Sequence, residues 1–321
     1  MFQSRLRQIA STLTLAATPL FITAAQAEAP MAKSQAPGWY RMKLGAFEIT
    51  ALSDGTVALP MDKLLTNTTA QKVNALLAKS YLKAPVETSV NGYLVNTGSK
   101  LVLIDAGAAG LFGPTLGKLV ANLKLSGYQP EQVDEIYITH MHADHVGGLV
   151  ADGKRVFPNA TVRADALEGG YWLSQANLDA APADAKSFFQ GAMASLGPYQ
   201  AAGKLKPFEG ATDLVPGIRA VPARGHTPGH TVYVAESEGQ RMAFWGDLMH
   251  VAAVQFAFPA VTIQFDSDPK AAAPQRMKNF ADAARQGYLV AGTHLSFPGV
   301  GQLRAEGRGY RWLPINYVSA P

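Results

Sequence analysis

The spacing of the histidines constrains this chain more than any other feature. Residues 140–145 read His-Met-His-Ala-Asp-His, which places three histidines and one aspartate in six positions of a chain that holds only seven histidines. The other four histidines are His226, His230, His250 and His294. Imidazole and carboxylate groups at this density are typical of a metal site, so the fold must bring these distant segments together.

Short apolar, β-rich runs separated by turn residues predict strands. They lie at residues 47–52, 92–96, 100–105, 135–139, 218–222, 231–235, 241–245 and 288–291. Segments between them have the length and composition of helices, at residues 115–125, 169–175, 185–194 and 269–285. In contrast, Asp54, within Leu-Ser-Asp-Gly, is expected in a turn.

The polar motifs follow these predicted strands. A strand leads into His140, another precedes His226, a third leads into Asp247 and a fourth leads to His294. Ligands at strand ends are fixed by the sheet while their side chains reach an open edge. We therefore expect an α/β fold of two sheets with helices outside and a metal cluster along one edge.

The ligands divide between two ions. Alternate residues leaving a strand can point the same way, so we expect a first ion on His140, His142 and His226. Asp144, His145 and His294 then remain for a second ion, and the carboxylate of Asp247 can bridge the two. The chain has no cysteine, so any metal must bind nitrogen and oxygen. Two divalent ions are expected, with zinc favoured and manganese, iron or cobalt as alternatives.

A pair of ions would supply its own nucleophile. Their combined charge lowers the pKa of a shared water until hydroxide exists at neutral pH, and the same ions polarise a substrate carbonyl or phosphoryl oxygen. The hypothesis is attack by a metal-bridging hydroxide, oriented by Asp247, on an ester carbonyl.

The motifs, in this order, resemble the metallo-β-lactamase superfamily. The resemblance rests on Leu-Ile-Asp-Ala-Gly at 103–107, Thr-His-Met-His-Ala-Asp-His-Val-Gly-Gly at 139–148, His-Thr-Pro-Gly-His at 226–230, Gly-Asp at 246–247 and Gly-Thr-His at 292–294. It implies the αβ/βα sandwich, built of two mixed sheets with outer helices, and the ligand set given above. It also implies that Asp105 orients a ligand histidine rather than binding metal. His230, at the start of the next strand, is expected to be a structural hydrogen-bonder.

A closer resemblance lies outside the metal motifs. Residues 40–42, 47–55, 107–115, 128–138 and 295–299 are similar to the methyl parathion hydrolase group. That group also resembles lactonases that open dihydrocoumarin and related aryl esters. The resemblance implies an exported, dizinc, homodimeric hydrolase of small molecules.

The same resemblance suggests the substrate pocket. Phe112, Trp172 and Phe188 fall where that group places an aromatic cage over the metals, although ordinary core packing is the alternative. The chain departs from the parathion-hydrolysing pattern at four further pocket positions, and residues 183–187 form a segment one residue shorter. The four residues are Leu64, His250, Ile263 and Phe265.

Bulkier side chains at three of these positions should narrow the pocket, and His250 could hydrogen-bond a substrate oxygen. Because a planar lactone needs less room than a tetrahedral phosphotriester, the departures favour opening of aryl lactones and esters such as dihydrocoumarin. The alternatives are an organophosphate phosphotriesterase, as the main or a side activity, and an acyl-homoserine lactonase. A mononuclear iron dioxygenase and a metal-sequestering protein also remain open.

The N-terminus resembles an export signal. Arg5 and Arg7 precede an apolar stretch at 9–25, and Ala-Gln-Ala at 25–27 is typical of a cleavage site. A membrane anchor is the alternative reading of this stretch. We expect a signal peptide at 1–27, a flexible lead-in at 28–36 and one hydrolase domain at 37–321, with a periplasmic or secreted product that has no membrane attachment.

The charge of the chain bears on its partners. Cleavage after residue 27 would lower the formal net charge from +4 to +2, since it removes two arginines and no acidic residue. No basic run is long enough to follow a phosphate backbone, so no nucleic-acid partner is expected.

Overall fold

The computed structural model describes residues 29–319, and the predicted export signal at 1–27 lies outside them. Residues 29–36 are exposed and have no regular structure. From Pro37 onward the chain forms one unit. Among the helices that lie between residues 29 and 319, none is long and apolar enough to span a bilayer.

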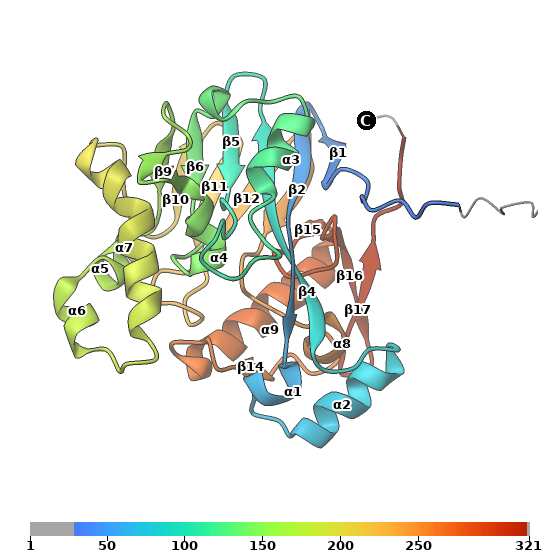
Figure 1. The fold of residues 1–321 in the computed structure, drawn as a ribbon. Helices are drawn as coiled ribbons and strands as arrows, with labels where there is room; N and C mark the ends of the chain where they lie inside the picture. The colour runs from blue at the N-terminus through green and yellow to red at the C-terminus, as the bar shows by residue number, and fades with distance from the viewer. Residues whose placement is uncertain (1–28, 320–321) are drawn as a thin grey trace, which may run out of the picture. The chain divides into compact units, whose positions relative to one another are not determined.

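Two mixed sheets form the centre of this unit (Figure 1). The strands of the first sheet are, in spatial order, β1 (Trp39–Leu44), β2 (Phe47–Leu59), β4 (Val86–Asn96), β5 (Leu101–Ile104), β6 (Glu135–Tyr137) and β9 (Thr161–Arg163). Those of the second are β10 (Thr212–Val215), β11 (Ile218–Pro222), β12 (Thr231–Ser237), β13 (Gln240–Phe244), β15 (Leu289–Ala291), β16 (Val300–Glu306) and β17 (Gly309–Pro314). Two ribbons of two strands each pair β3 (Leu65–Thr66) with β14 (Thr262–Ile263), and β7 (Val150–Ala151) with β8 (Lys154–Arg155).

Alternation along the strands builds layers of apolar core on both faces of the sheets. In β5, Val102 and Ile104 point into the layer between the sheets, whereas Leu103 points to the outer face of the first sheet. In β13, Phe244 lies in the central layer and Ala243 in the outer one. The sheets are therefore buried on both sides, which explains their nearly continuous apolar sequences.

Helices cover the outer faces. The helices are α1 (Met61–Leu64), α2 (Ala70–Lys79), α3 (Leu119–Leu125), α4 (Ala143–Val146), α5 (Ala166–Trp172), α6 (Gln175–Ala180), α7 (Lys186–Ala201), α8 (Ala252–Gln255) and α9 (Pro269–Gln286). Leucines of α3 and aromatic residues of α7 pack outside the first sheet, and Phe280 of α9 packs outside the second. The predicted αβ/βα sandwich of two mixed sheets with outer helices is confirmed.

The prediction of a turn at Asp54 is wrong. Asp54 lies inside the long strand β2, at a bulge, and is buried. Its carboxylate accepts hydrogen bonds from the backbone N–H groups of Ala108, Gly117 and Leu119, at 2.9, 3.0 and 2.9 Å. Asp54 therefore fixes the loop that follows β5, a role that its turn-like neighbours in the sequence conceal.

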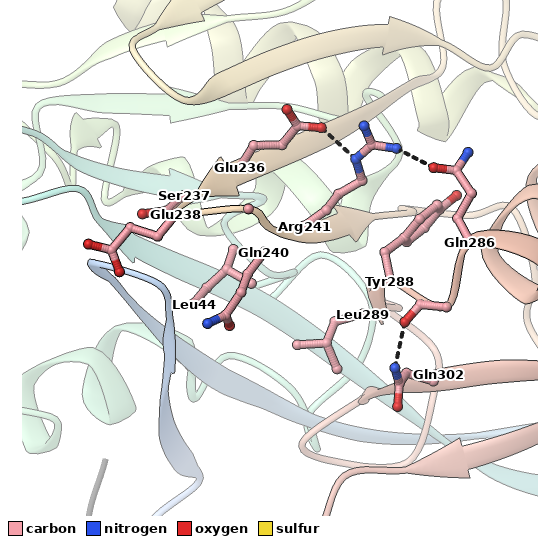
Figure 2. Close-up of a pocket in the computed structure, with 12 residues that line it drawn as sticks. Leu44, Glu236, Ser237, Glu238, Gln240, Arg241, Gln286, Tyr288, Leu289 and Gln302 are labelled. Carbon is pink, nitrogen blue, oxygen red and sulfur yellow. Dashed lines mark hydrogen bonds and ion pairs between the residues drawn. The ribbon is translucent and has the colours of Figure 1, made fainter.

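A hollow of about 790 Å³ lies at the β12–β13 hairpin, where β13 begins (Figure 2). Arg241, in its wall, donates to Glu236 and to Gln286. Among the described residues, no group of ligand-type or nucleophilic side chains converges there, so we assign no chemistry to it. The histidine motifs lie at the other end of β13.

Candidate metal centre

The predicted ligands meet at one edge of the two sheets. His140 follows β6, His226 follows β11, Asp247 follows β13 and His294 follows β15. Strands β5 and β6 are parallel, as are β13 and β15. Because the carboxyl ends of parallel strands share an edge, four segments distant in the sequence converge there.

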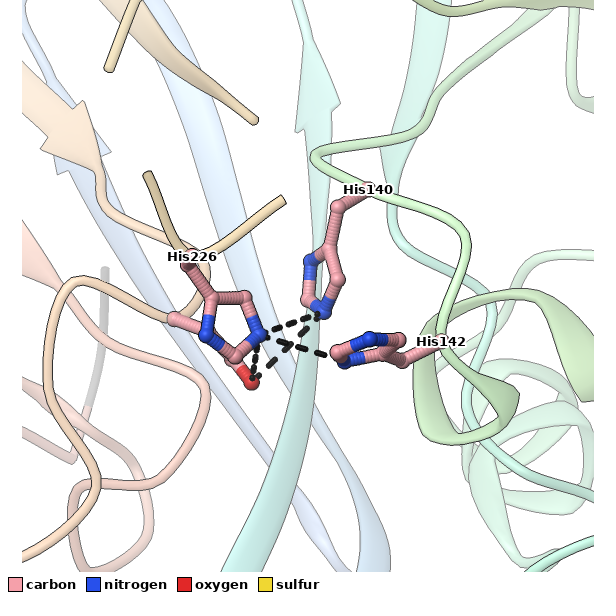
Figure 3. Close-up of side chains that lie close together, drawn as sticks. His140, His142 and His226 are labelled. Atoms are coloured by element: carbon pink, nitrogen blue, oxygen red, sulfur yellow. Dashed lines mark hydrogen bonds and ion pairs between the residues drawn. The ribbon is translucent and has the colours of Figure 1, made fainter. Parts of the chain in front are cut away.

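Three histidines form the first group (Figure 3). The Nε2 atom of His226 lies 3.2 Å from Nε2 of His140 and 3.2 Å from Nδ1 of His142. All three rings are buried. Three imidazole nitrogens that point at one small space are what a tetrahedrally bound cation requires.

The second group contains one carboxylate and two histidines. The Oδ2 atom of Asp144 lies 3.7 Å from Nε2 of His145 and 3.5 Å from Nε2 of His294. These three side chains, like those of the first group, are close enough together to hold one ion.

Asp247 lies between the groups. Its Oδ1 atom is 3.2 Å from Nε2 of His145 and 3.1 Å from Nε2 of His294. Its Oδ2 atom is 3.3 Å from Nε2 of His226 and 3.6 Å from Nε2 of His140. One carboxylate thus faces both groups, as a bridging ligand must.

Buried polar atoms in this cluster lack hydrogen-bond partners. They include Nε2 of His145 and Oδ1 of Asp247. Buried polar groups are almost always paired, so such atoms indicate a missing partner. A pair of divalent cations would satisfy them, and the residues present therefore fit a dinuclear metal site.

Further groups fix the orientation of the ligand histidines. Asp105 accepts from Nδ1 of His145 at 2.8 Å and, at its other oxygen, from the backbone N–H of Thr139 at 2.8 Å. Nδ1 of His294 donates to the carbonyl oxygen of Ser89 at 2.9 Å. Such bonds fix the tautomer that leaves Nε2 free to bind metal.

Asp266 orients His226 in the same way as Asp105 orients His145, by accepting a hydrogen bond from Nδ1 of the ring. Its Oδ1 atom lies 2.8 Å from Nδ1 of His226, and its side chain is fully buried. Asp266 is not among the residues that the sequence motifs predict for the site. Its neighbourhood, Phe-Asp-Ser-Asp-Pro, resembles the start of a helix, and Asp268 does cap α9 by accepting from the N–H groups of Lys270 and Ala271. Nothing local distinguishes the two aspartates.

The electrostatics agree with a set of metal ligands. Burial lowers the pKa of His140 well below its usual value, and neighbouring His145 lowers it further, so that ring stays neutral. Burial alone would raise the pKa of Asp247, but His294 and His145 hold it well below its usual range. Burial also lowers the pKa of His226, but Asp247 and Asp266 outweigh burial and raise that pKa to about 9. The carboxylates therefore favour positive charge at His226, as they would favour a bound cation.

His230 and His250 stand beside the cluster. Nε2 of His230 accepts from the backbone N–H of Asp247 at 3.0 Å, and its Nδ1 donates to the carbonyl oxygen of Ala223 at 3.1 Å. Both nitrogens of His230 are therefore engaged outside the metal groups. Nε2 of His250 lies 3.1 Å from Oδ2 of Asp247, whereas its Nδ1 is buried without a partner.

The hollow directly over the cluster is narrow and aromatic. It has a volume of about 30 Å³. Four of the predicted pocket residues line it, namely Phe112, Phe188, His250 and Phe265.

The other three predicted pocket residues do not line this hollow. Leu64 and Ile263 pack in the apolar cluster beneath it, because both belong to the segment around the β3–β14 ribbon. Trp172 packs edge-on against the ring of His142, with centroids 5.2 Å apart, and against Phe189 at 4.7 Å. These three side chains support the pocket from behind.

Comparison with known proteins agrees with this geometry. The chain matches the sequence model of the metallo-beta-lactamase superfamily over residues 85–259. It is similar in structure to the hydrolase AbOPH of the beta lactamase superfamily, with 40% identity and a TM-score of 0.85 over 89% of this chain and 100% of that one. It is also similar to AidC, a dizinc quorum-quenching lactonase solved with a product bound, with 26% identity and a TM-score of 0.82 over 88% of this chain and 99% of that one.

Among curated proteins, the chain is 32% identical over 176 residues to the ribonuclease TTHA0252 of Thermus thermophilus. That match covers 50% of this chain and 36% of the ribonuclease, so the chain spans about a third of that relative's length.

Proposed function

The chain belongs to the metallo-beta-lactamase superfamily and has a dinuclear metal site, and from that premise we propose that it hydrolyses lactones and aryl esters. Aryl lactones such as dihydrocoumarin are the proposed substrate class. The observation that carries this proposal is the aromatic lining of the narrow hollow over the cluster, where Phe112, Phe188 and Phe265 would move apart to admit a flat ring. A planar ring can stack on such side chains, whereas a tetrahedral phosphotriester with two alkoxy arms needs a wider space.

The proposed metal is zinc. The ligand set contains imidazole nitrogens and carboxylate oxygens, both of which zinc binds readily, and it contains no thiolate. The similarity to the dizinc lactonase AidC supports this choice. When bound, two zinc ions supply hydroxide at neutral pH and polarise the substrate carbonyl.

The protein's own residues position the reactants. Asp247 stays ionised and faces both ligand groups, so it can accept a hydrogen bond from the attacking oxygen and orient it. His250 lines the hollow and its Nε2 donates to the ionised Asp247 at 3.1 Å, so its Nδ1, which has no partner among residues 29–319, can accept a hydrogen bond from a water or from the hydroxyl of the opened product. A phenolate leaves readily, so opening of an aryl lactone needs little acid assistance from the protein.

An acyl-homoserine lactonase is the second candidate. It is supported by the similarity to AidC over nearly the whole chain. Its substrates differ from dihydrocoumarin in carrying a flexible acyl chain, which requires a groove that continues beyond the aromatic hollow over the cluster. The match to a ribonuclease does not favour a nuclease here, because the sequence has no basic run to follow a phosphate backbone.

The test compares three substrates with the zinc-loaded protein. Dihydrocoumarin, an acyl-homoserine lactone and methyl parathion are assayed for kcat/KM, each with and without a chelator. The proposal predicts chelator-sensitive opening of dihydrocoumarin at the highest kcat/KM. A higher kcat/KM for methyl parathion would overturn the pocket argument, and a higher value for the acyl-homoserine lactone would establish the second candidate.

A variant tests the role of Asp247. Asp247→Ala should abolish turnover of every substrate, while the matched control Asp213→Ala, at an exposed position, should retain full activity. Full activity of Asp247→Ala would exclude the proposed role.

The cellular setting is a separate proposal. We propose that residues 1–27 direct export and are removed, and that the mature chain forms a homodimer. Mass spectrometry of the periplasmic fraction should find an N-terminus at Glu28, and light scattering should give twice the chain mass. Retention of residues 1–27 or a monomeric mass would contradict these two points respectively.

A further inference from the structure

Glu168, in α5, is a completely buried carboxylate to which the proposed mechanism gives no role. Its Oε1 atom accepts from the backbone N–H of Met141 at 2.9 Å. Its Oε2 atom accepts from the hydroxyl of Thr227 at 2.8 Å and from the backbone N–H of Gly229 at 2.7 Å. Three donors thus converge on one side chain, which is the arrangement of an ionised acceptor.

These donors belong to two different ligand loops. Met141 lies between the ligands His140 and His142, and Thr227 directly follows the ligand His226. The two loops are 86 residues apart in the sequence, and the three ligands of the first ion come from them. Glu168 therefore joins, through one carboxylate, the two segments whose separation determines the size of the first metal site.

The contact between α5 and the second loop leaves no free space. A Cβ atom at Gly229 would lie 2.5 Å from the backbone nitrogen of Glu168 and 2.7 Å from its Cβ. The start of α5 is itself held, because Asp165 caps the helix by accepting from the N–H of Leu167 at 2.8 Å. The helix is therefore a rigid support from which Glu168 reaches both loops.

We propose that Glu168 is a positioning residue that holds the His140–His142 loop and the His226 loop at the separation that the first ion requires. The proposal concerns the metal site alone and does not depend on the choice of substrate. The second ion should be less affected, because Asp105 and the carbonyl of Ser89 orient its histidines independently.

Glutamine is the sharpest substitution at this position. Glu168→Gln keeps the shape, but an amide has one acceptor oxygen for three donors. If that oxygen faces Thr227 and Gly229, the amide NH₂ faces the N–H of Met141; if it faces Met141, the NH₂ faces the N–H of Gly229. In either orientation the amide NH₂ group faces a backbone N–H donor inside the protein, so the ligand loop that carries this N–H must move.

The experiment measures zinc affinity site by site in the full chain. Metal-free protein is equilibrated in a series of zinc buffers, and bound zinc per chain is measured by atomic absorption. Cobalt-substituted protein is followed in parallel by its visible absorption. Glu168→Gln should lower the affinity for one of the two ions by roughly 10–100-fold, which is the range typical when a hydrogen-bond partner of the metal ligands is lost. It should also change the visible spectrum of the cobalt-substituted protein.

Asp54→Asn is the matched control. Asp54 is also buried and also receives three N–H donors, but none of them lies in a ligand loop. Asp54→Asn should lower the unfolding temperature of the metal-free protein and leave the affinity for the first ion unchanged. Equal zinc affinities in Glu168→Gln and the unmodified protein would overturn the proposal, as would equal weakening in the two variants.

A milder variant decides the matter if Glu168→Gln does not fold. Thr227→Val removes one of the three donors to Glu168 and keeps the side-chain shape. A fall of about threefold or more in the zinc affinity of the first site supports the proposal, and an unchanged zinc affinity refutes it.

Discussion

Replacing Asp266 by asparagine tests how far metal affinity depends on the carboxylate behind His226. Asp266 accepts from Nδ1 of His226 at 2.8 Å, from the N–H of Ile263 at 3.1 Å, and lies 3.9 Å from the guanidinium of Arg276. An asparagine can keep its oxygen toward His226, but its NH₂ group then opposes the N–H of Ile263. The hydrogen bond to His226 is therefore weakened or lost in Asp266→Asn.

The size of the effect follows from these contacts. Loss of such a partner lowers metal affinity by roughly 10–100-fold, which corresponds to about 1.4–2.8 kcal/mol. The metal-free protein should also lose about 1–3 kcal/mol of unfolding free energy, because a buried polar pair is broken. Arg276 limits this loss, since it still donates to the carbonyl oxygens of Pro259 at 3.0 Å and Val261 at 2.6 Å.

The assay is zinc competition against a chromophoric chelator, with urea unfolding of the metal-free chain. Asp268→Asn, two residues away, is the control: Asp268 caps α9 and touches no ligand. Because asparagine caps a helix about as well as aspartate, this variant should change the unfolding free energy little and leave zinc affinity unchanged. If Asp266→Asn binds zinc as tightly as the unmodified protein, the reasoning about oriented ligand histidines is refuted.

Three further predictions follow from the site. Because Asp247 and Asp266 raise the pKa of His226 to about 9, and neighbouring carboxylates also raise the pKa values of His145 and His294, zinc must displace protons at neutral pH. Apparent zinc affinity should therefore rise between pH 7 and 9, by up to about tenfold per pH unit for each proton displaced; a flat profile would contradict this. Phe188→Ala should raise KM for dihydrocoumarin roughly tenfold without loss of zinc; an unchanged KM would remove Phe188 from the pocket. Gly148→Ala would place its Cβ 2.0 Å from the carbonyl oxygen of Ala106 and should lower the unfolding free energy by about 3 kcal/mol. Gly170→Ala, which has open space around its Cβ, should not lower it. Equal unfolding free energies of the two variants would contradict the packing argument.

Much of the fold could be predicted from the sequence because the strand signals are strong. Every predicted strand lies in or largely overlaps an observed one, and the strand at Ile218–Pro222 has the predicted bounds. The reason is that apolar residues occur on both faces of strands that are buried on both sides. The order of the motifs along those strands then indicated which side chains meet.

The bounds of the helices were harder to predict. The segment 115–125 was expected to be helical throughout, but α3 begins at Leu119 because Gly117 adopts a φ of +87°, outside the helical region. The segment 169–175 divides into α5 and α6, since Ser174 caps the second helix by accepting from the N–H of Asn177. Both differences depend on single-residue backbone conformations that periodicity does not reveal.

The groups that support the site were the hardest to predict. Asp54, Glu168 and Asp266 are ordinary acidic residues in the sequence, and each acquires its role only from donors on distant segments. The ligand histidines, in contrast, occur in short dense motifs. A metal site can thus be recognised from its ligands, whereas the residues that orient those ligands require the fold.

The most direct test of the account is a titration of metal-free protein with zinc, in which dihydrocoumarin opening is measured against zinc bound per chain. The account predicts little activity until the first ion is bound and a maximal rate at two zinc ions per chain. A maximal rate at one ion, or a rate independent of zinc, would contradict the dinuclear mechanism.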